Sequence, residues 1–172
     1  MSAPTSGSLI AAVFGLIFVV ANTGPLPAPV AALLQGIACA VFVAILLALH
    51  RRSDRPSSLV RATGPALGRV YWVVVAGEAG ATAAGLVALN GPLNSPQAAM
   101  AWISLVVGVH FFALAIVWKQ PFFHGLGSAI AVCGAVGLVL AAAGASDAAI
   151  AATGGVLPGA LLLAASLRGS AL

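Results

Sequence analysis

Two ionisable side chains of this chain lie deep inside long apolar stretches. Glu78 stands in YWVVVAGEAGATAAGLVAL, and His110 stands in WISLVVGVHFFALAIVWK. Glu78 follows Arg69 by nine residues and His110 precedes Lys119 by nine, so in antiparallel helices both lie ~13 Å from the same end. A carboxyl group and an imidazole can exchange a proton, and ionisable groups inside membrane helices are enriched in proton and ion pathways. The spacing predicts an intramembrane polar pair, which either handles a proton or merely satisfies its own polar atoms.

The composition decides what kind of structure holds this pair. Of 172 residues, 62% are hydrophobic and 6% are charged, whereas soluble domains carry roughly a quarter charged residues. The apolar stretches show no alternation of polar and apolar residues, which disfavours a transmembrane barrel. The predicted fold class is all-α: a polytopic transmembrane helical bundle that forms a single domain over residues 1–172, in the cell (plasma) membrane.

The number of spans and their orientation follow from apolar windows and basic residues. A span needs about 20 apolar residues, and six windows approach that length: 8–22, 30–49, 69–89, 99–118, 125–144 and 149–167. All seven Lys and Arg lie in or beside the second and fourth connections or after the last window. Because basic residues mark the cytoplasmic side, we expect both termini to be cytoplasmic. Aromatic residues near the window ends, among them Trp72 and Trp102, indicate interfacial anchors.

The N-terminal window allows a second interpretation. The residues VVA before Asn22 resemble a signal-peptide cleavage site, but MSAPTSGS has no basic residue of the kind such a signal carries. We therefore expect the first helix to be retained. The alternative is that this helix is a signal peptide and is cleaved off.

Several weaker signals concern packing. Gly155 and Gly159 form a GxxxG pattern in the last window, and further close contacts are expected at Gly77, Gly80, Gly134 and Gly137. Pro158 should kink the last helix and free a carbonyl near Gly154. Cys39 and Cys133 are expected to be small buried hydrophobic residues, with no disulfide and no metal site. Four further polar residues are candidates for a pathway or for packing between helices: Gln35, Thr82, Ser104 and Ser128.

Five arginines surround the second connection: Arg51, Arg52, Arg55, Arg61 and Arg69. Basic residues beside the cytoplasmic ends of spans attract anionic lipids. We expect these arginines to contact anionic lipids of the cytoplasmic leaflet, with no role in nucleic-acid binding.

The segment GVHFFALAIVWKQPFF, residues 108–123, resembles a pattern in small uncharacterised multi-span bacterial integral membrane proteins. In these proteins a Gly-x-His-Phe helix is followed by Leu-Ala, a short basic turn and an aromatic start to the next helix. Where they often have Pro before the Leu, this chain has Ala113. The resemblance implies that Gly108, His110 and Phe111 act as one unit, and it implies no activity.

The pair of Glu78 and His110 favours a small proton-linked transporter or a channel-like protein. A haem-binding membrane redox subunit is an alternative, although one deep histidine per chain would require a dimer for two histidine ligands. A structural or accessory membrane subunit fits the sequence as well. No catalytic residue is identified, so an enzyme acting on lipid is disfavoured. No cofactor is predicted apart from the haem of the alternative, and a chain this small favours a homo-oligomer.

Overall fold

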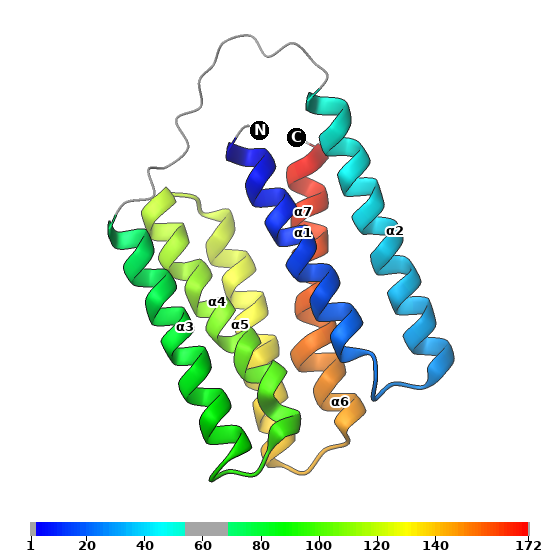
Figure 1. Ribbon diagram of the computed structural model, residues 1–172, viewed down its shortest axis with the longest axis vertical. Coiled ribbons are helices and arrows are strands. Elements are labelled where there is room, and N and C mark those ends of the chain that lie inside the picture. Colours follow the sequence, from blue (N-terminus) through cyan, green and yellow to red (C-terminus); the bar gives the residue numbers. More distant parts are fainter. Residues whose placement is uncertain (1–2, 54–68, 172) are drawn as a thin grey trace.

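The computed structural model describes residues 3–53 and 69–171, and every regular element in these ranges is helical (Figure 1). Five helices are long and apolar enough to cross a membrane, and Gly7–Asn22 is a shorter apolar helix. The elements are α1 (Ala3–Asn22), α2 (Ala28–Ser53), α3 (Arg69–Asn90), the short 3-10 turn η1 (Pro96–Ala98), α4 (Ala99–Trp118), α5 (Phe122–Ala142), α6 (Asp147–Ala151), the π-helical turn η2 (Ala152–Val156) and α7 (Leu157–Ala171).

The helix limits follow from residues that start or stop helices. Pro121 precedes α5, which begins at Phe122, so His124 belongs to the first turn of α5 and not to the connection that the sequence predicts. Gly144 follows α5 with a φ of 71°, a left-handed conformation that glycine adopts without strain. Ser146 then caps α6, because its side chain accepts a hydrogen bond from the Ala149 N–H at 3.3 Å.

The long helices run side by side as a bundle with two halves (Figure 1). One half contains α3, α4 and α5, and the other contains α1, α2 and α7; contacts of α5 with α7 join them. The ends marked N and C lie at the same end of the bundle as the end of α2, the start of α3 and the turn between α4 and α5 (Figure 1). Every second connection therefore returns to one end of the bundle.

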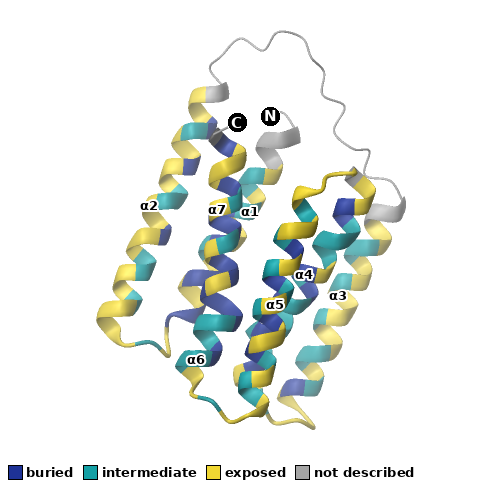
Figure 2. Ribbon diagram, turned by 180° about the vertical axis from the view of Figure 1, so that it is seen from behind, coloured by how far each residue is buried: buried dark blue, intermediate teal, exposed yellow. Residues whose placement is uncertain are grey.

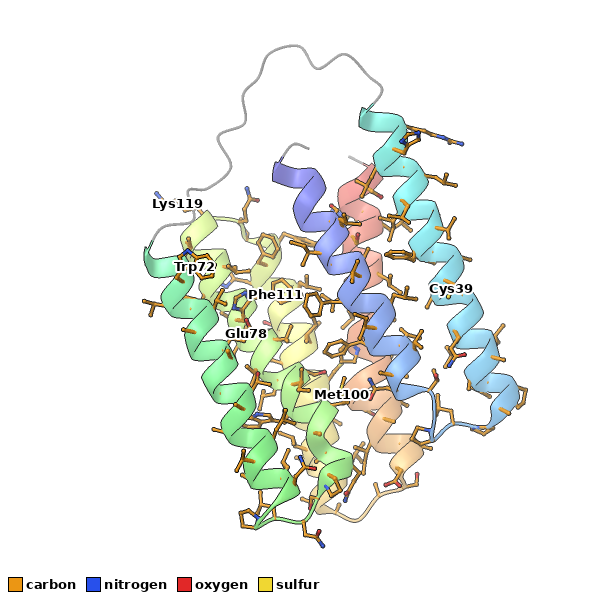
Figure 3. All side chains as sticks on the ribbon, in the orientation of Figure 1. Cys39, Trp72, Glu78, Met100, Phe111 and Lys119 are labelled. Carbon is orange, nitrogen blue, oxygen red and sulfur yellow. The ribbon has the colours of Figure 1, made fainter. Side chains whose placement is uncertain are left out.

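Many residues of the outer helices are exposed (Figure 2), and large apolar side chains are among them. Val73 and Val87 on α3 and Leu33 on α2 are each more than 60% exposed. Soluble monomers rarely expose large continuous apolar surfaces, whereas lipid-facing helices do so by necessity. Cys39 on α2 is exposed, so the prediction that it is buried is wrong: α2 contacts α1 and α7 and leaves its other side open (Figure 3). Cys133 is half-buried.

Glycines set the closest helix contacts. At Gly15 and Gly159, where α1 meets α7, an added Cβ on either residue would lie 2.8 Å from the other's carbonyl oxygen. Gly108 and Gly134 allow α4 and α5 to approach in the same way, since an added Cβ would overlap the opposite backbone.

Other predicted packing glycines divide into two groups. Gly137 contacts Gly154, and Gly155 lies against Asn22. Gly77 and Gly80 face open space instead, so the prediction of close packing there is wrong. The reason is that α3 packs mainly against α4 and turns these two residues away from any backbone.

The last span is interrupted by the π-helical turn η2, where the Leu157 N–H donates to the Ala152 carbonyl instead of to the residue four positions back. Pro158 follows and has no N–H to donate to the Gly154 carbonyl. Ser104 of α4 supplies the missing donor: its buried Oγ donates to Gly154 O at 2.6 Å. The proline on one helix and the serine on another thus form a complementary pair.

This arrangement predicts a coupled effect on stability. Ser104→Ala should lower the free energy of unfolding by ~1 kcal/mol, because the Gly154 carbonyl loses its donor inside the bundle. In a Pro158→Ala background the N–H of residue 158 can donate to the Gly154 carbonyl in place of the Ser104 hydroxyl. Ser104→Ala should then lower the free energy of unfolding by less. Unfolding in detergent, followed by circular dichroism, measures both effects. Ser128→Ala, at an exposed position of α5, is the control; an equal cost of Ser104→Ala in both backgrounds would contradict the explanation.

Candidate functional site

Glu78 and His110 meet between α3 and α4. These helices are antiparallel neighbours joined by residues 91–98, which include η1. His110 Nδ1 lies 3.0 Å from Glu78 Oε2, and their side chains are 13% and 27% exposed, respectively. Figure 3 places Glu78 within the length of α3, below Lys119 at the end of α4. The structure thus brings together the two residues that the sequence places at matching depths.

The contact has the distance of an ion pair but not the direction of a hydrogen bond. His110 Nδ1 is buried, and in the described structure it has no hydrogen bond of acceptable geometry despite the 3.0 Å separation from Oε2. A rotation of either side chain would align donor and acceptor. The two groups are therefore close enough to share a proton without being locked in one hydrogen bond.

The surroundings of His110 explain why its ring turns toward α3. Gly108 and Phe111 lie on the side of α4 that faces α5: the Gly108 carbonyl approaches Gly127, and the Phe111 ring stacks on Phe123 at 5.8 Å. His110 stands on the other side of the helix, because residues two apart in a helix point about 200° apart. The Gly-x-His-Phe segment thus joins α4 to both neighbours at one level.

A cavity of about 390 Å³ lies beside the pair, in a groove between α3 and α4. Apart from Glu78, His110 and the indole of Trp102, its walls are aliphatic or glycine. The lining residues on α3 are Val74, Gly77, Glu78 and Ala81, and those on α4 are Trp102, Leu105, Val106, Val109, His110 and Ala113. An apolar wall with a few convergent polar groups is typical of sites for small molecules.

Trp102 closes the other end of this groove, and its role is one that the sequence did not identify. Its indole N–H donates to Ala81 O at 3.1 Å, and the ring occupies the space left by Gly85. The sequence predicts only an interfacial position for Trp102, whereas the structure shows that it also joins α4 to α3. The spacing could have indicated this contact. Ala81 lies three residues after Glu78 and therefore shares its face of α3, and Trp102 lies eight residues before His110 and shares its face of α4.

The other polar candidates are not gathered at the pair. Gln35 Nε2 donates to Thr23 Oγ1 at 2.6 Å, near the turn between α1 and α2, and Ser104 contacts Gly154 as described. Thr82 is half-buried on α3, and Ser128 is exposed on α5. Gln35 and Ser104 therefore stabilise contacts between segments.

The sequence also missed a buried polar group at the end of α1. Asn22 is 4% exposed, its Nδ2 donates to Phe18 O at 2.7 Å, and its side chain lies against Gly155. Its place at the start of a predicted connection gave no reason to expect burial.

Most of the predicted lipid-contacting arginines cannot be placed. Arg51 is exposed near the end of α2. Arg55 and Arg61 lie outside the described residues, as do the side chains of Arg52 and Arg69.

The contact predicts that Glu78 and His110 stabilise the protein as a unit. Glu78→Gln and His110→Ala should each lower the free energy of unfolding, and the double variant should cost less than their sum by about 0.5–3 kcal/mol. Denaturation of the purified protein in detergent provides the four values. Asp147→Asn combined with His110→Ala is the matched control and should be additive. Additivity in the Glu78 cycle as well would show that the two groups do not interact.

No protein-family model, no curated protein and no solved structure matches this chain. A function is therefore argued from the site itself, in which one carboxyl group and one imidazole adjoin an apolar groove between two helices.

Proposed function

We propose that this protein is a small proton-linked transporter or a channel-like protein, in which the Glu78–His110 pair binds the transported proton. The observation that carries the proposal is the 3.0 Å contact between Glu78 Oε2 and His110 Nδ1, deep within apolar helices. A charged group at this depth is costly, so such residues are retained mainly where a pathway uses them. The partial exposure of Glu78 supports access of a proton or ligand from the groove.

The proposal includes a membrane topology of six spans with both termini in the cytoplasm of a cell whose plasma membrane holds the protein. Five apolar helices and the shorter Gly7–Asn22 support this count. Arg51, Lys119 and Arg168 all belong to helix ends on one side of the bundle, which supports a cytoplasmic location for that side. On that side the arginines around the second connection would contact anionic lipids.

Proton movement tests the function. In proteoliposomes that enclose a pH-sensitive dye, a membrane potential should drive proton flux through the wild-type protein if it is channel-like, and a gradient of an exchanged cation should drive it if the protein is a proton-linked transporter. Glu78→Gln should reduce the flux to that of protein-free liposomes, because an amide cannot take up and release the proton. Asp147→Asn removes the other acidic group of the described residues and should leave the flux unchanged. If neither a potential, nor a pH gradient, nor a gradient of a lipophilic cation drives a flux that depends on Glu78, the proposal fails.

Thiol labelling tests the topology. In a variant whose Cys39 and Cys133 are replaced by Ser, single cysteines are introduced at Asn94, between α3 and η1, or at the exposed Gln120, between α4 and α5. A membrane-impermeant maleimide added to intact cells should label position 94 only, and position 120 only after the membrane is opened. The reverse pattern would invert the topology.

A further inference from the structure

We propose that the groove between α3 and α4 binds a lipophilic monovalent cation, with the Glu78 carboxylate as its counter-ion. The inference rests on the proposed function, because it names the class of molecule that exchanges with the proton. It is carried by the shape of the groove, by the residues of its lining and by the 3.0 Å contact between Glu78 and His110.

The shape and lining of the groove suit an apolar molecule. Its volume of about 390 Å³ lies within the roughly 300–1,000 Å³ of small-molecule sites. Valine, leucine and alanine side chains from both helices supply most of the wall, and the Trp102 indole supplies one end. Beside Glu78, the wall is formed by Gly77, where an added Cβ would meet no atom within 4 Å. The groove is therefore open at the residue that precedes Glu78.

The charge of the groove favours a cation over an anion. Glu78 and His110 are the titratable groups of its lining, which contains no Lys or Arg. Among the described side chains of α3, α4 and α5, the other charged or titratable groups are Lys119, which ends α4, half-buried Cys133, and His124, which lies against Phe112. The lining of the groove thus offers a molecule the carboxyl group of Glu78 and no Lys or Arg.

The proposed exchange starts from a pair that holds one proton, which either partner can carry. Glu78 carboxylic acid beside neutral His110 carries one proton, and so does the Glu78 carboxylate beside the His110 imidazolium. In the proposed exchange a bound cation takes the place of the proton beside the Glu78 carboxylate. One proton leaves as one cation binds, so the net charge of the groove stays at zero. This neutrality avoids the cost of placing an uncompensated charge in hydrocarbon.

Tetraphenylphosphonium and tetraphenylborate test the proposal, because they have the same shape and opposite charge. Calorimetric titration of the purified protein in nanodiscs of zwitterionic lipid should detect binding of the phosphonium and not of the borate. Repeating the titration in buffers of different ionisation enthalpy should show release of one proton per cation. Because one proton is released for each cation bound, affinity for the phosphonium should rise with pH.

Three variants locate the site. Glu78→Gln should weaken phosphonium binding by about tenfold or more. Gly77→Leu should weaken it by filling the groove while leaving Glu78 in place. Gly80→Leu is the matched control, because Gly80 also faces open space on α3 but does not line the groove, and its affinity should equal that of the wild type. Monodisperse elution in size-exclusion chromatography shows which variants are folded, and Gly77→Leu keeps the test decisive if Glu78→Gln does not fold.

Several results would overturn the proposal. Equal binding of the borate would indicate nonspecific apolar partition, and full affinity in Glu78→Gln or Gly77→Leu would place the cation elsewhere. Exclusion of the phosphonium by a stable dimer that covers the groove would show that a second copy occupies it. If the cation fails to bind while proton flux still depends on Glu78, this inference is wrong and the proposed function stands. If the cation binds at Glu78 but no proton flux depends on Glu78, the proposed transport function is wrong and the groove is a binding site only.

Discussion

The close approach of α4 to α5 determines the geometry of the candidate site. At Gly108, Gly127 and Gly134 the two backbones are so near that no other residue type fits without displacement. This contact fixes the rotation of α4 about its own axis. Once the side of α4 that carries Gly108 and Phe111 is held against α5, the opposite side, with Val106, Val109 and His110, must face α3 and line the groove. The contacts of Gly108 and Phe111 with α5 thus determine that His110, on the opposite side of α4, points toward α3.

The sequence was sufficient for the all-helical fold class and for most helix limits, because apolar windows and Pro or Gly breaks act locally. Depth along a helix is also local, which is why Glu78 and His110 could be placed at one level. Rotation about the helix axis is not local. Gly77 and Gly134 look alike in sequence, yet one faces open space and the other faces a backbone. Only the neighbouring helices decide this, and the same is true of exposed Cys39 and buried Asn22.

The bundle satisfies its polar groups in two different ways. Around η2 and the end of α1, hydroxyl and amide groups donate to specific oxygens, as Ser104 does to Gly154 and Asn22 to Phe18. The Ser104 contact joins α4 to η2, and the Asn22 contact lies within α1. Beside the groove, the buried Nδ1 of His110 is near a carboxylate without an aligned hydrogen bond. The two regions therefore differ in geometry: the first contains aligned hydrogen bonds, and the second contains a close polar contact without one.

The peripheral position of α3 also bears on how the protein enters the membrane. Its mean hydropathy of 1.6 is the lowest among the five apolar spans of the described chain. Glu78 adds the free-energy cost of placing a carboxyl group in hydrocarbon, and an isolated α3 has no partner that lowers this cost. Because a short turn links α3 to the more apolar α4, with a mean hydropathy of 2.3, the two can enter the bilayer together as a helical hairpin. In such a hairpin His110 would reach Glu78 during insertion, so the histidine that lines the groove would also lower the cost of inserting α3.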